Sequence, residues 1–321
     1  MAASRPRNLR EMLRLPRNLG DAVFQLAVFL MAGAILAIIV LLGIEIFDGA
    51  SLGLSTYGFG FLIDSNWDPV NNSYGSLPAV FGTVTSSLLA LAIAGPLGLF
   101  MAIFLAELAP PWIERPLSFL VELLASIPSV VIGLWGLFVI VPLLRDPIEK
   151  TLHDKLGFLP IFDCTPLGLG MLAAVVILAI MILPYAAAVA RDSLRAVPAS
   201  QREASLALGA TQWETIWNVV APYARSGIVG GLLLALGRAV GETMAVTMVI
   251  GNRPDVSACL FNPAYTLASQ IANEFAEATS PIYVSVLIEL GLVLFAVTLI
   301  MNAIARLLLW RLNRQAGSHA E

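Results

Sequence analysis

Six long apolar stretches constrain this chain more than any other feature of its sequence. A helix needs about 20 mostly apolar residues to cross a bilayer, and each stretch reaches that length. The chain is 58% hydrophobic and only 12% charged, whereas a soluble domain is about 25% charged. We therefore expect an all-α polytopic membrane protein with six transmembrane helices. The expected spans are residues 22–46, 80–106, 117–144, 167–190, 227–251 and 282–310.

The distribution of Lys and Arg predicts how these spans are oriented. Of the 18 basic residues, thirteen flank the spans on the side of the N-terminus, four lie on the other side, and Arg238 lies within a span. Short loops rich in Lys and Arg stay in the cytoplasm, so we expect both termini there. This gives a basic cytoplasmic tail at 1–21 that leads into a retained first span, a six-span domain at 22–310 with a cytoplasmic loop at about 191–226, and a C-terminal tail at 311–321.

Several classes of function find no support in the sequence. The net charge of −4 argues against nucleic acid as a partner, because nucleic-acid binding needs a basic patch. Lys150 and Lys155 are preceded by acidic residues, so the Gly-Lys-Ser/Thr core of a nucleotide-binding loop is absent. His153 and His319 stand alone, with no metal-ligand spacing. We expect no catalytic site, no metal site and no cofactor in this chain.

Two cysteines, Cys164 and Cys259, fall in loops expected outside the cytoplasm. Disulfides persist on the oxidising side of a membrane. The pair is compatible either with one disulfide that ties two outer loops together or with two separate thiols, because the sequence gives no distance between them.

Arg238 and Glu242 interrupt the apolar run GIVGGLLLALGRAVGETMAVTMVIG at residues 227–251. A charge at the centre of a bilayer costs about 3 kcal/mol or more, so Arg238 is expected to face protein or water. Glu242 follows one helical turn later on nearly the same face; Glu122 and Glu289 are other candidate partners. One interpretation is a structural ion pair. The other is a substrate pathway in which the Arg238 guanidinium meets an anion and Glu242 tempers its affinity.

Two further stretches leave alternatives open. SIPS at residues 126–129 places a proline inside the third span, so Ser126 and Ser129 either flank a tolerated kink or lie at a broken helix whose amides face an oxyanion. NEFAEA at 273–278 is either a contact or gate at the outer face or a solvated loop.

The loop RDSLRAVPASQREASLALGATQWETIWNVVAPYARSG at residues 191–227 predicts two short helices. Ser200 with Glu203, and Thr211 with Glu214, have the spacing of capping boxes, and Gly209 permits a left-handed turn between them. Helices this short need something to pack on. Physical reasoning alone leaves a protein-docking surface and a helix lying on the lipid surface equally open.

The same loop resembles the cytoplasmic EAA loop of ABC-importer permeases. Glu203, Ala204, Gly209 and Pro222 match that motif, while Ser205 departs from it. The resemblance implies a coupling helix that seats in a groove of an ATP-binding subunit, with Glu203, Ala204 and Gly209 at the joint.

LGRAVGETMAVTMVIGN, WDPVNNSYGSLPAVFGT, ELLASIPSVVIGLWGLF and LAIMILPYAAAVARD together resemble the C-type permeases of the phosphate-specific transport (Pst) ABC importers. That family implies the type I (MetI-like) importer architecture in the bacterial inner membrane, phosphate as cargo, and Arg238 and Glu242 as transport residues. It also implies a second, A-type permease, a dimer of ATP-binding subunits that hold ATP and Mg, and an extracytoplasmic phosphate-binding protein.

Three alternatives remain from the sequence. An ion-coupled secondary anion transporter would use Glu242 as a proton carrier and would leave the docking loop unexplained. An intramembrane enzyme is disfavoured because no set of nucleophile, base and metal is present. The same ABC machine could also carry an oxyanion other than phosphate.

Overall fold

The computed structural model describes residues 19–317, with side chains over residues 20–307. Most of the expected basic tail at 1–21 and the side chains of the tail at 311–321 lie outside the described residues, and the boundaries of these segments stay a prediction. The described part of the chain divides after Gly49 into two compact units. The first ends within helix α2 (Leu19–Tyr57), whose large apolar residues from Val23 to Phe47 are mostly exposed, as expected of a helix in a membrane.

Six helical segments of the described chain are long and apolar enough to span a membrane, which confirms the expected number. In order along the chain these segments are Gly20–Tyr57, Leu77–Leu108, Ser129–Leu156, Met171–Arg195, Gln212–Gly241 and Pro281–Leu307.

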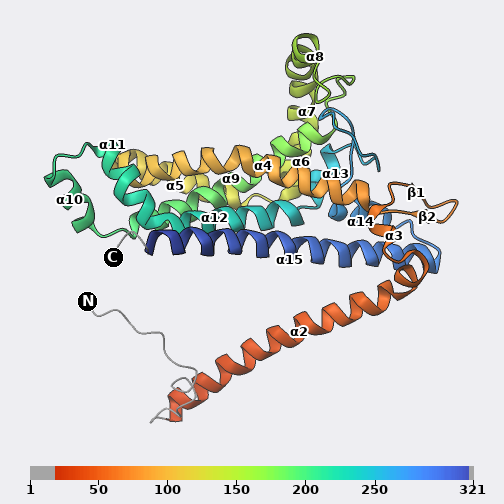
Figure 1. Ribbon diagram of the computed structural model, residues 1–321, viewed down its shortest axis with the longest axis horizontal. Helices are drawn as coiled ribbons and strands as arrows, with labels where there is room; N and C mark the ends of the chain where they lie inside the picture. The colour runs from red at the N-terminus through yellow and green to blue at the C-terminus, as the bar shows by residue number, and fades with distance from the viewer. Residues whose placement is uncertain (1–18, 318–321) are drawn as a thin grey trace. The chain divides into compact units, whose positions relative to one another are not determined.

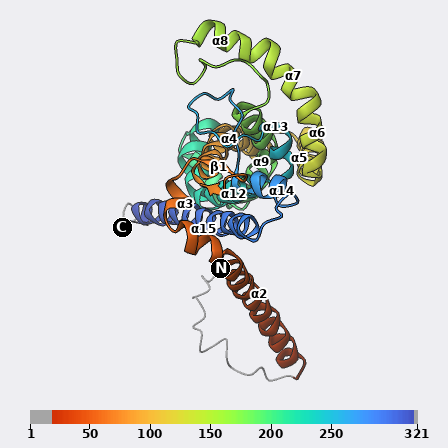
Figure 2. The same ribbon diagram turned by 90° about the vertical axis from the view of Figure 1, so that its right-hand side faces the viewer.

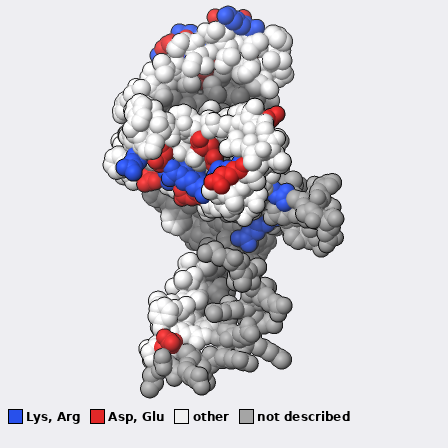
Figure 3. Space-filling model, turned by 90° about the vertical axis from the view of Figure 1, so that its left-hand side faces the viewer, with Lys and Arg blue, Asp and Glu red and all other residues white. Residues whose placement is uncertain are grey.

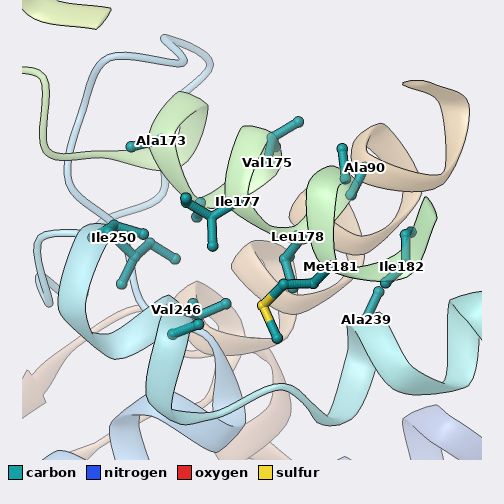
Figure 4. Packing of buried hydrophobic residues seen from close by; sticks show 14 of the residues in the cluster. Ala90, Ala173, Val175, Ile177, Leu178, Met181, Ile182, Ala239, Val246 and Ile250 are labelled. Atoms are coloured by element: carbon teal, nitrogen blue, oxygen red, sulfur yellow. The ribbon is translucent and has the colours of Figure 1, made fainter. Parts of the chain in front are cut away.

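The second unit is built on α9 (Met171–Arg195), which packs between α4 (Leu77–Ile103) and α12 (Ala221–Gly241). Small residues allow the close approach that helix association in a membrane requires; a Cβ at Gly98 would lie 3.1 Å from the Ala186 Cβ. The apolar core lies along α9, and Figure 4 shows Ile177, Leu178 and Met181 of α9 pointing toward the facing helices.

The third and fifth spans, expected at 117–144 and 227–251, are both broken. The break in the third span is one of the two alternatives that the sequence left open at Pro128, whereas the break in the fifth was not expected. Helix α5 (Pro111–Ser126) ends before Pro128, and α6 (Ser129–Trp135) begins after it. Proline lacks an N–H and disfavours the helical conformation of the residue before it, which accounts for the first break. Helix α12 ends at Gly241, and α13 (Met244–Val249) follows after two non-helical residues.

The chain beyond α6 continues through α7 (Val141–Leu143) to α8 (Lys150–Leu156), with π-helical turns η2 (Gly136–Ile140) and η3 (Leu144–Glu149) between them. Figure 2 shows α6, α7 and α8 passing around the outside of the bundle formed by α4, α9 and α12.

One end of the second unit, which the charge pattern predicts to be extracytoplasmic, is called the outer end. It holds α3 (Gly60–Ile63), the antiparallel hairpin of β1 (Trp67–Asp68) and β2 (Ser73–Tyr74), and α14 (Leu267–Glu274) (Figure 1). These elements pack on the start of α15 (Pro281–Gly317) through an aromatic cluster.

Cys164 and Cys259 form a disulfide with a Cα–Cα distance of 6.3 Å. The bond joins the loop before α9 to the loop after α13, and Leu260 N–H donates to the Ile161 carbonyl beside it at 3.0 Å. Of the two alternatives that the sequence left open, the structure has the disulfide.

The opposite, inner end carries the connection between α9 and α12. It consists of α10 (Ala199–Ala207), α11 (Gln212–Thr215) and the π-helical turn η4 (Ile216–Val220), which runs directly into α12. The second expected short helix is therefore the first part of the fifth span, not a separate piece. The orientation of the two ends across the membrane stays a prediction.

Candidate functional site

Arg238 and Glu242 lie at the point where the fifth span breaks. Arg238 is in the last turn of α12, and Glu242 is the first residue after it, with φ −70° and ψ 127°. Arg238 Nη2 lies 3.5 Å from Glu242 Oε2. Figure 4 shows the non-helical turn that joins α12, which carries Ala239, to α13, which carries Val246. The pair expected from the sequence is present, but on a broken rather than a continuous helix.

The break fixes the Glu242 side chain from both sides. Its Oε2 faces Arg238, and its Oε1 accepts a long hydrogen bond of 3.4 Å from the backbone N–H of Ala245, in the first turn of α13. A carboxylate is favoured near the amides at a helix start. The Glu242 side chain is 6% exposed, whereas that of Arg238 is 34% exposed, so the cation is the more accessible partner.

Tyr185 of α9 is a neighbour of Arg238 that the sequence analysis did not single out. The Arg238 guanidinium carbon lies 5.1 Å from the centre of the Tyr185 ring, within the range of a cation–π contact. The Tyr185 hydroxyl donates to the Ala125 carbonyl at 3.1 Å. Arg238 is thereby held against the end of α5, and a tyrosine directly after the proline of an otherwise aliphatic span was the available signal.

The other candidate partners of Arg238 are occupied or elsewhere. Glu122 pairs with Arg191, with 3.1 Å between Oε1 and Nη2. Glu289 is buried in α15 against Gly53, and its Oε2 has no hydrogen-bond partner. Within the side chains that the structure describes, the ion pair of Arg238 is with Glu242. The Nε of Arg238 is buried and has no hydrogen-bond partner.

Ser126 and Ser129 flank the break between α5 and α6. The Ser126 hydroxyl donates to the Leu123 carbonyl at 2.7 Å, and Ser129 is the first residue of α6. Because Tyr185 bonds to Ala125, this break lies close to the Tyr185–Arg238 contact. A direct role for either serine stays a prediction.

The inner-end loop presents an exposed surface. Glu203, Ala204 and Gly209 are all exposed, as are the apolar side chains of Leu208 and Trp213. Figure 3 shows basic and acidic side chains interleaved over the inner end. A loop with this much exposed apolar surface suits a docking partner.

The local structure of this loop agrees with the predictions from the sequence in two features and differs from them in one. Gly209 has φ +88°, the left-handed conformation expected there, and Thr211 with Glu214 forms a capping box. The prediction of a capping box at Ser200 is wrong, because α10 begins at Ala199, directly after the extended Pro198, and has no side-chain cap.

At the outer end, Glu274 is buried rather than solvated. Its Oε2 accepts hydrogen bonds of 2.7 Å from Trp67 Nε1 and from the Tyr283 hydroxyl. Burial raises the pKa of the Glu274 carboxyl, although these hydrogen bonds act in the opposite direction. Glu274 therefore ties the hairpin to α15, while Glu277 of the same segment is exposed. No group of three or more His, Cys, Asp or Glu side chains within residues 20–307 is arranged to hold a metal ion.

Comparisons with known proteins agree with this architecture. Residues 94–314 match the family of binding-protein-dependent transport system inner membrane components. The chain is 46% identical to a phosphate transport system permease protein PstC of Pasteurella multocida over 92% of this chain and 91% of that protein. It is 45% identical to a PstC of Mesorhizobium japonicum over 94% of this chain and 93% of that protein.

Among solved structures, a subunit of a bacterial ABC transporter involved in the import of the acidic polysaccharide alginate has a similar fold. The TM-score is 0.61 at 14% identity, over 92% of this chain and 99% of that subunit. The same likeness holds for an alginate ABC transporter in complex with its periplasmic protein, with a TM-score of 0.59 over 90% of this chain and 96% of that subunit. At this identity the likeness concerns the fold, which is that of type I ABC importer permeases.

Proposed function

The chain belongs to the C-type phosphate transport permeases within the family of binding-protein-dependent inner-membrane transport components, and from this membership we propose how its residues move phosphate. It is a multi-pass protein of the inner membrane. It forms the translocation pathway of an ATP-driven phosphate importer together with a second, A-type permease subunit.

The observation that carries the proposal is the Arg238–Glu242 pair at the broken fifth span. An arginine stays charged at any working pH, and its planar fork matches phosphate oxygens. The exposed third of the Arg238 side chain leaves it capacity for an anion. Phosphate contacts Arg238 on its way through the membrane, and the break allows α13 to shift relative to α12.

Glu242 and Tyr185 set the strength of this contact. Glu242 competes with phosphate for the guanidinium, so that the anion can leave, as a transport site requires. Tyr185 holds the guanidinium by its ring and leaves the edge free for hydrogen bonds. Ser126 and Ser129, at the neighbouring break, complete the proposed pathway.

ATP hydrolysis acts on this chain at the inner end. A dimer of ATP-binding subunits holds ATP and Mg, and one of the two subunits receives the exposed surface of α10 in a groove, with Glu203, Ala204 and Gly209 at the contact. The left-handed turn at Gly209 supports this role because it sets α10 apart from the continuous helix that carries Arg238. The chain has no ATPase site of its own, and an extracytoplasmic binding protein delivers phosphate to the outer end.

Uptake of radiolabelled phosphate into proteoliposomes that hold the full assembly tests this function. ATP inside the vesicles should drive uptake, and a nonhydrolysable ATP analogue should not. Uptake driven by a proton gradient without ATP would establish an ion-coupled transporter instead. Competition by excess sulfate or arsenate identifies the oxyanion class, and sulfate that competes as well as phosphate would contradict phosphate as the cargo.

A further inference from the structure

The short helix α10 is fastened to the membrane bundle by one arginine. Arg202 Nη2 lies 2.6 Å from Glu107 Oε1, and Arg202 Nε lies 3.0 Å from Glu107 Oε2. This is the two-point geometry in which guanidinium–carboxylate pairs are strongest and most specific in direction. The Glu107 side chain is 10% exposed and that of Arg202 is 24% exposed, so water screens the pair less than an open surface ion pair.

The same arginine also binds the backbone of the segment that leads into α10. Arg202 donates to the carbonyls of Leu194, at 2.8 Å, and of Val197, at 2.5 Å. On the far side of α10, Gln212 Nε2 donates to the Glu107 carbonyl at 3.2 Å. The segments before and after α10 therefore meet at Glu107, which fastens the inner loop to η1 (Phe104–Leu108). This contact lies beside the apolar packing of Val197, Ile216 and Val220 in the cluster that contains Ala102 and Ile103 of α4.

Few other contacts hold α10 in place. None of its residues is buried. It packs on α11 and η4 at the start of the fifth span, and its other side-chain hydrogen bond joins Ser205 to Thr215 of α11. A helix of nine residues without a buried face has little stability of its own. Its position relative to η1 and α4 therefore depends mainly on the Arg202–Glu107 pair.

Glu107 lies at the inner end of a helix that reaches the outer end of the molecule. It is part of the π-helical turn η1 (Phe104–Leu108), which continues α4. Together α4 and η1 run for 32 residues, or roughly 48 Å at the rise of an α-helix. Near the other end, Thr83 Oγ1 accepts the N–H of Leu267 at 2.8 Å, and Gly82 packs directly on the Tyr265 carbonyl.

Along its length α4 packs on α9 and on α12, the helix that carries Arg238. A displacement at Glu107 is therefore passed both to the helix of the proposed phosphate contact and to the loop that leads into α14 at the outer end. We propose that Arg202 and Glu107 form the joint through which α10 drives α4, so that they act as positioning residues for the coupling of ATP hydrolysis to transport. This inference rests on the proposed function as an ATP-driven importer.

The test compares Glu107→Gln with wild type in the full assembly in proteoliposomes, with phosphate uptake and ATP hydrolysis measured on the same vesicles. Glutamine keeps the size and one acceptor but loses the charge that holds Arg202. We expect hydrolysis to continue while phosphate taken up per ATP falls roughly tenfold, within the 5–150-fold range of measured couplings between sites. Arg202→Lys keeps the charge but loses the two-point geometry, and it should also lower the phosphate taken up per ATP.

Glu114→Gln is the matched control. Glu114 pairs with Arg195 at the same end of the molecule, but this pair joins α5 to α9 and leaves α10 attached. It should keep the wild-type ratio of uptake to hydrolysis. In Glu107→Cys/Arg202→Cys, a bifunctional maleimide across the introduced thiols should restore the lost coupling, and a cross-linked protein that hydrolyses ATP but stays uncoupled would overturn the proposal.

The outcomes separate this inference from the proposed function. If the wild-type assembly showed no ATP-driven uptake, the proposed function as an ATP-driven importer would fail. If the wild type shows ATP-driven uptake and both Glu107→Gln and Arg202→Lys keep the wild-type ratio of uptake to hydrolysis, only the proposed role of the Arg202–Glu107 pair would be overturned. Equal loss in Glu114→Gln, or loss of hydrolysis and uptake together through failed assembly in both joint variants, would make the pair structural and overturn the proposal.

Discussion

Replacing Glu242 by Gln should make the transporter bind phosphate more tightly and release it more slowly. In the proposed pathway, Glu242 and phosphate compete for the same guanidinium. Glutamine has the same shape as glutamate and keeps an oxygen to accept the Ala245 N–H, so the start of α13 should persist while the negative charge is lost.

The separation of the pair sets the size of this effect. At 3.5 Å, two unit charges attract by about 5 kcal/mol at an effective dielectric constant of 20 and by about 1 kcal/mol in water. Arg238 is one third exposed, which places the effective attraction toward the lower value. About 1.4 kcal/mol corresponds to a tenfold change in affinity, so we expect the half-saturating phosphate concentration to fall roughly tenfold, with a lower maximal rate.

The assay is the concentration dependence of phosphate uptake into proteoliposomes with saturating ATP inside. Glu289→Gln is the matched control, because it removes another membrane carboxyl that does not pair with Arg238. It should leave the half-saturating concentration unchanged. An unchanged or raised half-saturating concentration in Glu242→Gln would refute the competition between Glu242 and phosphate.

Three further predictions concern the ends of the molecule. Cys164→Ser/Cys259→Ser should lower the thermal unfolding temperature of the purified protein, and reductant should lower that of wild type but not of the variant. Cross-linking a loop of this length contributes at most about 4–5 kcal/mol, and a smaller fall is expected because the intervening spans stay in the detergent micelle. Gly209→Ala should strain the left-handed turn by about 1–2 kcal/mol and reduce phosphate-stimulated ATP hydrolysis, and unchanged hydrolysis would contradict the role of this turn. Because folding raises the pKa of Glu274 above its ordinary value of 4.5, the folded state binds protons more tightly than the unfolded state. The stability that this carboxyl contributes is therefore full below pH 4.5 and is lost as pH rises through the raised pKa; Glu274→Gln should flatten this dependence in melting curves, and a parallel dependence in both proteins would contradict it.

The number of spans and the turn of the inner loop follow from local sequence. Apolar length alone determines how many helices can cross a bilayer, and a glycine between two short helical patterns marks the left-handed residue that only glycine adopts without strain. These features depend on residues close together in the chain, and they were predicted correctly.

The breaks and contacts that build the site depend on tertiary structure. The sequence is apolar again from Met244 onwards, so the run of residues 227–251 has the length and composition of one continuous span and does not reveal that α12 ends at Gly241. The contacts of Glu242 with Arg238 and with the next helix become visible only in three dimensions. Tyr185 lies 53 positions before Arg238 in the sequence, and the two cysteines are 95 residues apart. The burial of Glu274 likewise depends on Trp67, which lies on a distant hairpin.

The most direct test of the account is phosphate uptake by the full assembly carrying Arg238→Gln, with ATP inside the vesicles and ATP hydrolysis measured in parallel. Uptake should be lost while the subunits still assemble and still hydrolyse ATP, because the anion no longer meets a cation in the pathway. Uptake equal to that of wild type would show that the Arg238–Glu242 pair is a structural ion pair and would contradict the proposed pathway.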